Sequence, residues 1–432
     1  MTRGPRPRRG PPLHTAWARF RVAKADETRL SGQGRKGLAV RQRRLSGAGQ
    51  AALKSGGGTI QMSASLLERS TAQSSALKII DCDVHPNVRG GFASLYPYMP
   101  EAWSRRFIRK NSSMSSLALT TKYQQPNGSA IREDTRAESG EAGGTDPAQV
   151  VVDHLDRHHI EAALLNSLQG GSFSCALAST DESIVLASAF NDFFIHEWLA
   201  VDRRLRYSMV TPSLDPHAAA EEIRRVGRHP QIAGVMLAPI NMLMGNRYWW
   251  PLYEAAQDLG LPIVVHPTGA DSIYQGTPIS AAGIPDSYIE RYVTLTQGAE
   301  SNLNSLVMNG TFAKFPGLKV IFVEFGFTWL LPLVWRMDRT WRQLRHETPW
   351  VKRSPVDYVH DHVRFSTQPL DEPDDPQDLE KLIALMGVDH LCFSTDYPHW
   401  DNDMPAQSLL ALAPADRRRI FYDNAASVLR LS

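Results

Sequence analysis

The chain has 432 residues, with 47 Lys and Arg against 45 Asp and Glu, and three cysteines. It contains no apolar run near the roughly 18 residues that a membrane-spanning helix needs, and its cysteines form neither a CxxC pair nor an even disulfide framework. These features argue against a membrane protein, a zinc ribbon and a disulfide scaffold, and we expect a soluble, cytoplasmic protein. The length is normal for one α/β barrel with insertions.

The first 76 residues differ from the rest, since they hold 15 Lys and Arg against 3 Asp and Glu and are rich in Gly, Pro and Ser. Such a composition buries too little apolar surface to offset chain entropy, so we expect residues 1–75 to form a disordered basic extension. Met62 follows three glycines, whose G-rich codons can act as a ribosome-binding site, and we expect translation to begin there. A transit peptide or an arm that binds nucleic acid is the alternative, and we rank nucleic-acid binding last.

From residue 76 onward, short β-branched apolar runs alternate with amphipathic stretches. The runs are Leu77–Cys82, Ala162–Leu165, Arg206–Val210, Gly234–Leu237, Pro262–His266, Lys319–Glu324, Val363–Ser366 and His390–Thr395. Helical periodicity is visible at Val150–His159, Ile184–Val201, Pro216–Val226 and Trp250–Leu259. This alternation predicts βα units around a parallel sheet, and eight units predict a single (β/α)8 TIM barrel over residues 76–432.

A long polar stretch, Ser112–Asp146, separates the first predicted strand from the helix at Val150. Connections that leave the C-terminal end of a barrel strand commonly form lids and substrate loops. We interpret this stretch as a mobile cover over the active face. A disordered insertion without function is an equal alternative.

Charged or ligating side chains end several of the apolar runs. Asp83 and His85 end the first run, His266 ends the fifth, and Asp396 follows the eighth. Because strand C-termini of a barrel converge on one rim and alternate residues share a face, these four side chains are predicted to hold one divalent ion. Two imidazoles and two carboxylates suit Zn²⁺ or Mn²⁺. Taken singly, each residue is explained as well by a strand end, a core histidine or a helix N-cap.

Five motifs carry a resemblance to a known family: DCDVHP at Asp81, HLDRHHIEAALLN at His154, VVHP at Val264, FPGLKVIFVEFGFTWL at Phe315 and FSTDYPHWD at Phe393. In order and spacing, they resemble the amidohydrolase-related decarboxylases and hydratases typified by aminocarboxymuconate semialdehyde decarboxylase. The likeness runs from about Lys78 to the C-terminus. It implies a metal-dependent barrel enzyme that acts on a small carboxylic acid, and it suggests a homodimer, which the sequence leaves open.

The resemblance also implies roles for single residues. The family's H-x-H or E-x-H ligands match Asp83 and His85, its metal histidine matches His266, and its last-strand aspartate, a ligand that also transfers protons, matches Asp396. An aspartate in the first position departs from the family pattern, and its shorter side chain can leave the ion more weakly held.

A second departure is Glu324, which occupies the position of the family's catalytic histidine after the sixth strand. Facing the ion, Glu324 would act as a general base or as an additional ligand. The alternative is a structural ion pair with Arg336 or Arg339. His399, three residues after Asp396, is a further candidate to donate a proton or to orient a substrate carboxylate.

Other polar residues receive plainer interpretations. Asn166 and Ser394 lie near strand ends, where nothing in the sequence separates polar site residues from ordinary strand termini. The basic and aromatic run WRMDRTWRQLR is interpreted as helix packing with ion pairs at the rim. We expect His154, His158 and His159 to lie on the surface.

The reaction that we favour is non-oxidative decarboxylation, the lysis of a carbon–carbon bond in a small organic acid, including aromatic acids, with the ion stabilising negative charge. Hydrolysis or hydration of an ester, lactone, amide or unsaturated acid by metal-activated water is the near alternative. A different class also remains open: because Asp83 and Glu324 depart from the family, the barrel can be a catalytically inactive protein that binds small acids.

Overall fold

The computed structural model describes residues 77–113, 130–137, 139–177, 179–268 and 285–431. The basic extension, the proposed start at Met62 and part of the proposed cover, residues 114–129 and 138, lie outside the described residues. Within the described part, no helix combines the length and the apolar character needed to cross a membrane.

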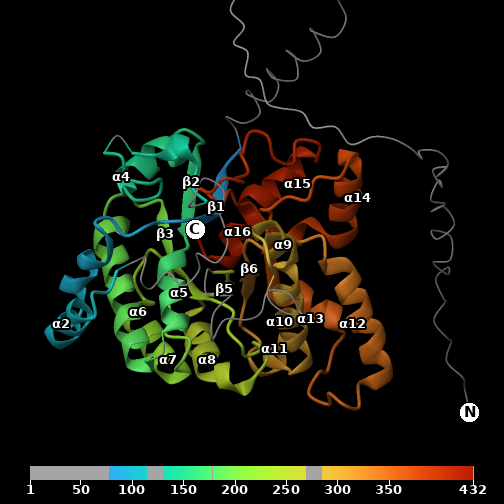
Figure 1. Ribbon diagram of the computed structural model, residues 1–432. Coiled ribbons are helices and arrows are strands. Elements are labelled where there is room, and N and C mark those ends of the chain that lie inside the picture. Colours follow the sequence, from blue (N-terminus) through green and yellow to red (C-terminus); the bar gives the residue numbers. More distant parts are fainter. Residues whose placement is uncertain (1–76, 114–129, 138, 178, 269–284, 432) are drawn as a thin grey trace, which may run out of the picture. The chain divides into compact units, whose positions relative to one another are not determined.

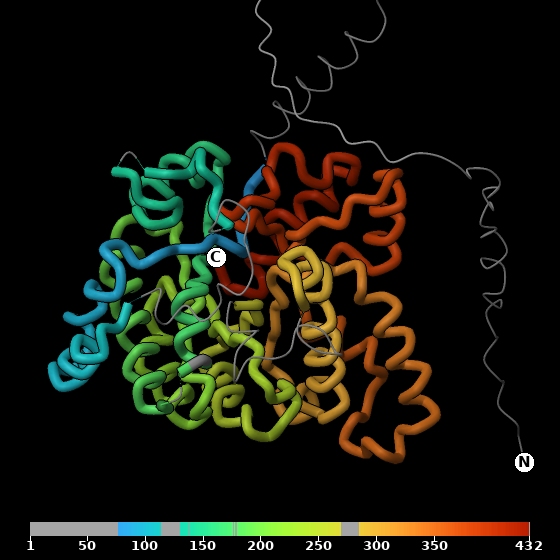
Figure 2. The backbone as a smooth tube through the Cα atoms, viewed as in Figure 1, coloured from blue at the N-terminus to red at the C-terminus, as the bar shows by residue number. Residues whose placement is uncertain are grey.

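Eight parallel strands form one sheet in sequence order. They are β1 Ile79–Val84, β2 Ile160–Leu165, β3 Leu205–Val210, β4 Ile232–Leu237, β5 Ile263–Val265, β6 Val320–Phe322, β7 Val363–Ser366 and β8 Leu391–Cys392. The N–H of Cys82 donates to the carbonyl of Phe393 at 2.9 Å, and the N–H of Asp396 donates to the carbonyl of Asp83 at 3.1 Å, so β1 closes against the chain that leaves β8. The predicted (β/α)8 barrel is confirmed, and Figure 2 shows the blue first strand beside the red C-terminal segment.

Helices follow the strands around the sheet (Figure 1). The longer α-helices are α2 Glu101–Arg109, α5 Leu168–Ala176, α6 Thr180–Phe194, α7 Pro216–Val226, α8 Trp250–Leu259, α9 Tyr288–Thr294, α10 Thr296–Met308, α12 Leu330–Leu344, α13 Pro355–His362 and α14 Pro376–Met386. Shorter elements include η1 Gly91–Tyr98, α4 Pro147–Val150, η4 Val151–Asp156, η5 Ile195–Leu199, α11 Thr311–Lys314, α15 Pro414–Arg418, η9 Arg419–Asp423 and α16 Asn424–Val428.

Helix starts follow from capping side chains. The Asp215 carboxylate accepts the N–H groups of His217 and Ala218, both at 3.0 Å, and Pro216 occupies the first helical position of α7, where a missing N–H costs nothing. This helix has the predicted bounds. Helix α6 begins four residues before the predicted start, because the Ser179 side chain caps it.

The barrel interior is packed rather than open. Ile80, Cys82, Leu164, Val264, Ile321 and Cys392 form a buried cluster that includes Ala425 and Val428 of α16. Helix α16 therefore packs against the barrel interior, and the free end of the barrel is the rim where the strands finish. A second, larger cluster fills the space between the strands and the surrounding helices.

A β-bulge in β1 aims Asp83 at the rim. Asp81 pairs with Ala163 and Val84 with Leu165, so three steps along β1 match two along β2. The extra residue breaks the alternation of faces, as bulges do at barrel rims and next to active sites. Cys82 joins the barrel interior, whereas Asp81 contacts a helix outside it.

The contact of Asp81 corrects an expectation from the sequence. The Asp81 carboxylate lies 2.8 Å from Nε2 of His154 and accepts a 2.6 Å hydrogen bond from the Thr395 hydroxyl. His154 is only 1% exposed, and the Tyr397 ring stacks on it at 4.3 Å. The surface location predicted for His154 is wrong, because the helix η4 turns this side chain toward the seam between β1 and the chain after β8; His159 is exposed as expected.

We expect His154→Ala to lower the free energy of unfolding by about 2 to 4 kcal/mol, because a fully buried carboxylate loses a partner. His360→Ala removes the imidazole of an exposed pair with Asp361 and should cost less than about 1 kcal/mol. Urea unfolding followed by circular dichroism measures both. Equal losses in the two variants would contradict a stabilising role of the buried contact.

Candidate metal centre

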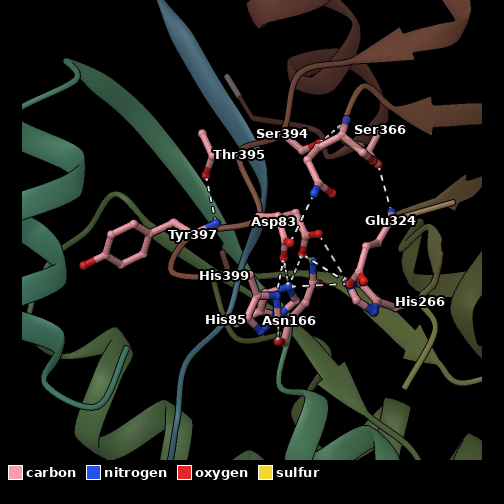
Figure 3. A network of polar contacts seen from close by, with 12 residues as sticks. Asp83, His85, Asn166, His266, Glu324, Ser366, Ser394, Thr395, Tyr397 and His399 are labelled. Atoms are coloured by element: carbon pink, nitrogen blue, oxygen red, sulfur yellow. Dashed lines mark hydrogen bonds and ion pairs between the residues drawn. The ribbon is translucent and has the colours of Figure 1, made fainter. Parts of the chain in front are cut away.

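Six side chains predicted from the sequence lie together at the C-terminal rim of the barrel, and Figure 3 labels five of them, all except Asp396. Ligand atoms of Asp83, His85, His266 and Glu324 all lie within 4.8 Å of one another, and so do those of His85, Glu324, Asp396 and His399. Both sets are suited to hold a metal ion. The structure thus brings together every residue that the sequence analysis named for the site.

Each of the two histidines is held by a backbone carbonyl at Nδ1. Nδ1 of His85 lies 2.9 Å from the carbonyl oxygen of Asn166, and Nδ1 of His266 lies 2.6 Å from that of Pro267. A carbonyl oxygen only accepts, so Nδ1 is the donor in both rings. In the neutral rings, the lone pairs of both Nε2 atoms therefore point into the centre, as in histidines that ligate metals.

Carboxylate oxygens surround these Nε2 atoms. His85 Nε2 lies 2.7 Å from Asp396 Oδ1 and 3.3 Å from Asp83 Oδ1, and His266 Nε2 lies 3.3 Å from Asp83 Oδ1 and 3.4 Å from Glu324 Oε2. His85 Nε2 is buried and makes no well-directed hydrogen bond with a described residue. Lone pairs and carboxylates at these distances repel one another unless a proton or a cation lies between them. The residues fit a divalent ion.

Without a metal ion, protons on the side chains of the centre supply the positive charge. Burial lowers the pKa of His85 and His266, but the neighbouring carboxylates together outweigh it. Asp83 and Asp396 raise the pKa of His85 well above its ordinary value, and Asp83 and Glu324 raise that of His266. Burial, with the neighbouring carboxylates, raises the pKa of Glu324 and Asp396 well above the usual range. The pKa of Asp83 is lowered despite its burial, because His85 and His266 face it.

Asn166 orients two of the proposed ligands at once. Its side-chain Nδ2 donates to Asp83 Oδ1 at 2.8 Å, while its backbone carbonyl oxygen accepts from His85 Nδ1. The Ser208 hydroxyl donates to the Asn166 side-chain oxygen, which fixes the amide. The sequence analysis could not single out Asn166, and its only signal was a polar residue that directly follows β2.

Glu324 lies two residues beyond β6 and faces the two histidines. The proposed ion pair with Arg336 or Arg339 is not what the structure shows, because the carboxylate of Glu324 turns inward to His266 and, at 4.0 Å, to His85. The N–H of Glu324 donates to the Ser366 hydroxyl at 3.0 Å.

Glu324 and Asp396 share an unusual backbone conformation. Their φ angles are 63° and 62°, in the left-handed region that costs a non-glycine residue roughly 1 kcal/mol or more. Asp396 lies four residues beyond the end of β8, so the last strand is shorter than predicted. Tight turns after β6 and the β8 segment thus direct both carboxylates into the centre.

His399 lies against Asp396 and His85. Its Nδ1 lies 2.7 Å from Asp396 Oδ1, and its ring stacks on the His85 ring at 4.3 Å. Burial and the neighbouring His85 lower the pKa of His399 to about 3, so the ring is neutral and Nδ1 donates to Asp396. Ile131, in the described end of the proposed cover, forms a backbone bridge with His399.

Comparisons with known proteins give a consistent family. A family model described as "Amidohydrolase" matches residues 80–431. A gamma-resorcylate decarboxylase from Polaromonas sp. (strain JS666 / ATCC BAA-500) is 27% identical over 301 residues, which are 64% of this chain and 86% of that protein. A second one, from Rhodococcus jostii (strain RHA1), is 25% identical over 64% of this chain and 85% of that protein.

Similar solved structures share the barrel. An amidohydrolase from Mycobacterium avium subsp. paratuberculosis K-10 has a TM-score of 0.63 at 18% identity, over 83% of this chain and 99% of that chain. A 5-carboxyvanillate decarboxylase from Novosphingobium aromaticivorans DSM 12444, complexed with manganese and a nitrobenzoic acid, has a TM-score of 0.60 at 18% identity, over 82% and 97%. A dihydroxybenzoic acid decarboxylase from Polaromonas sp. JS666, with bound manganese and 2-nitroresorcinol, has a TM-score of 0.57 at 20% identity, over 82% and 97%. At these identities the likeness concerns the fold.

We expect Mn²⁺ binding at pH 7 to release about one proton or more per ion, because a metal needs neutral imidazoles and ionised carboxylates. The raised pKa values of His85 and His266 keep protons on these rings above their ordinary titration range, so affinity should rise with pH. Calorimetric titration in two buffers with different ionisation enthalpies counts the protons. His360→Ala should leave the count unchanged, and identical heats in both buffers would contradict the prediction.

Proposed function

The chain belongs to the amidohydrolase family, whose model spans residues 80–431, and on that premise we propose that it is a metal-dependent decarboxylase of small aromatic carboxylic acids. The observation that carries the proposal is that two overlapping sets of ligand atoms, which share His85 and Glu324, bring two oriented imidazoles and three carboxyl groups to the rim. The curated relatives named above, two gamma-resorcylate decarboxylases, support the choice of decarboxylation.

Asp83, His85, His266 and Asp396 would hold the ion, with Glu324 as a further ligand. Asp396 belongs to the second of the two sets, which shares His85 and Glu324 with the first. Manganese is favoured over zinc, because carboxylate-rich sites suit Mn²⁺ and two of the similar structures are described with manganese. When bound, the ion supplies positive charge that binds the substrate's carboxylate or an adjacent hydroxyl and stabilises negative charge developing on the substrate.

Asp396 is proposed to transfer the proton. Burial raises its pKa well above the usual range when no ion is bound, and its carboxyl group and that of Glu324 belong to one cluster of ligand atoms within 4.8 Å. Two carboxyl groups this close share a proton more easily than they ionise together. In the reaction, the proton of Asp396 goes to the ring carbon that bears the carboxylate. The carbon–carbon bond then breaks, its electron pair returns to the ring, and CO₂ leaves.

His399 would keep the donor group aligned. Its neutral ring donates through Nδ1 to Asp396 Oδ1, so the orientation of this carboxyl group is held while its proton moves. Stacking on His85 places the same ring beside a proposed ligand. We therefore assign His399 to the positioning of Asp396, and Asp396 to proton transfer.

Hydrolysis is the second candidate function, and the observation that favours it is Glu324. A partly buried carboxyl group with a raised pKa among the proposed ligands has the properties of a general base that takes a proton from water. The product distinguishes the two reactions, since only decarboxylation releases CO₂. A chain that keeps metal and releases neither product would be a binding protein.

Manganese-loaded protein should release CO₂ from 2,6-dihydroxybenzoate or 5-carboxyvanillate, the acids that the relatives' names suggest. We expect His266→Ala to lose most of its metal, measured by elemental analysis, and Asp396→Asn to lower kcat by about 10³-fold or more, because proton transfer by a positioned group contributes 10²- to 10⁴-fold. His360→Ala is the control for both. A parent protein without metal after growth in added Mn²⁺ and Zn²⁺ would refute the proposal.

Substitution of Glu324 tests its part in the shared proton. Glu324→Gln should lower kcat about 10²-fold, since an amide cannot exchange a proton with Asp396. Glu324→His, which restores the family's residue, should lose less than Glu324→Gln. Steady-state CO₂ release at saturating substrate measures both, and a fully active Glu324→Gln variant would exclude Glu324 from the chemistry.

A further inference from the structure

Asp396 is connected to helix α9 by three further side chains, which we call the Gln368–Asp401–Tyr292 chain. Gln368 Nε2 donates to Asp396 Oδ2 at 3.2 Å and to Asp401 Oδ2 at 3.0 Å. The Tyr292 hydroxyl, on α9, donates to the same oxygen of Asp401. In this chain the Gln368 amide and the Tyr292 hydroxyl donate, and oxygens of Asp396 and Asp401 accept.

Gln368 is buried in the rim, and hydrogen bonds of its backbone hold it there. Its residue is fully buried, its N–H donates to the Ser394 hydroxyl at 3.1 Å, and its carbonyl accepts from the Ser366 hydroxyl at 3.0 Å. Ser366 is also the acceptor for the N–H of Glu324. Gln368 therefore contacts one proposed proton-sharing carboxyl group, that of Asp396, directly through its side chain. Through its backbone carbonyl it contacts Ser366, which supports the other, Glu324.

The outer end of the chain is held by aromatic packing. The Tyr292 ring lies 5.9 Å from the Trp400 ring and 6.0 Å from the Tyr288 ring. Burial and Asp401 raise the pKa of Tyr292 far above its ordinary value, so the phenol keeps its proton and remains a donor. Tyr292 and Asp401 also line a cavity of about 930 Å³.

We propose that Gln368, Asp401 and Tyr292 are positioning residues that fix the orientation of Asp396. The two oxygens of Asp396 have different environments: Oδ1 faces His85 and His399, and Oδ2 faces only Gln368 in the contacts described. Without the donor from Gln368, Oδ2 is free to rotate toward the centre and Oδ1 away from it. Asp401 and Tyr292 act one step further out, because they hold the amide of Gln368 in the orientation that presents Nε2.

The inference rests on the proposed function, since it assigns Asp396 to the ion and to the proton, but it can be tested without catalysis. Partners that orient a metal ligand typically change metal affinity or activity 10- to 100-fold. The variants are Gln368→Met, which removes the amide at similar volume, and Tyr292→Phe and Asp401→Asn, which change single atoms. Tyr98→Phe is the matched control, because it removes a tyrosine hydroxyl from a 2.7 Å contact with Glu197, outside the chain.

Two measurements of Mn²⁺ binding to the full-length protein test whether these residues position Asp396. The dissociation constant for Mn²⁺, from competition with a chelating dye, should rise about 10-fold in Gln368→Met and by a smaller factor in Asp401→Asn and Tyr292→Phe. The Mn²⁺ electron paramagnetic resonance spectrum should change in the same order. With substrate, kcat should fall while KM stays near the parent value. Tyr98→Phe should match the parent in every readout.

The double variant Gln368→Met/Tyr292→Phe supplies the sharpest outcome. If Tyr292 acts only through Gln368, it adds nothing to the loss in Gln368→Met, whereas independent residues give additive losses. Additive effects, or variants with lowered thermal stability but unchanged Mn²⁺ affinity and spectrum, would overturn the proposal. A parent protein that binds Mn²⁺ but releases no CO₂ would refute the decarboxylase function. The Mn²⁺ measurements would still test whether the Gln368–Asp401–Tyr292 chain positions Asp396.

Discussion

Buried carboxylates and imidazole nitrogens that face one point can coexist only if positive charge lies among them. In this barrel the charge is required by geometry, because both histidines commit Nδ1 to backbone carbonyls and aim Nε2 at carboxylate oxygens 2.7 to 3.4 Å away. The raised pKa values of His85, His266, Glu324 and Asp396 have the same cause, because without an ion the centre retains protons that supply the positive charge or remove negative charge. A divalent ion meets this requirement for positive charge at a single position. The proposed chemistry depends on the ion because protons would otherwise supply that charge.

The rest of the architecture serves to hold that arrangement. The bulge in β1 turns Asp83 inward and Asp81 outward, and the contact of Asp81 with His154 and Thr395 joins β1 to the chain after β8. Asp81 and Thr395 close the barrel, and two proposed ligands lie next to them in the sequence: Asp83 two residues after Asp81, and Asp396 directly after Thr395. Stability of the seam and geometry of the centre are therefore linked.

The two departures from the family pattern have different consequences. The shorter Asp83 still reaches the centre, since its carboxylate lies 3.3 Å from both Nε2 atoms, and Asn166 holds it there. In the proposed function, Glu324 would change the chemistry more, because the resemblance places it where the family has an imidazole and its carboxyl group can share a proton with Asp396. This exchange makes the centre richer in negative charge and favours a hard, oxygen-preferring ion.

The sequence by itself determined the eight strands and the residues that meet at the rim, because strand periodicity is local and parallel strands of a barrel end on one side. It also located Glu324 and His399 through motif order. Only the tertiary structure decided the partners: His154 inside the seam rather than on the surface, Glu324 against histidines rather than arginines, and Asn166 and Gln368 as supports of Asp83 and Asp396. Such pairings join segments tens to hundreds of residues apart, and they depend on a bulge, two left-handed turns and side-chain orientation, none of which leaves a periodic signal in the sequence.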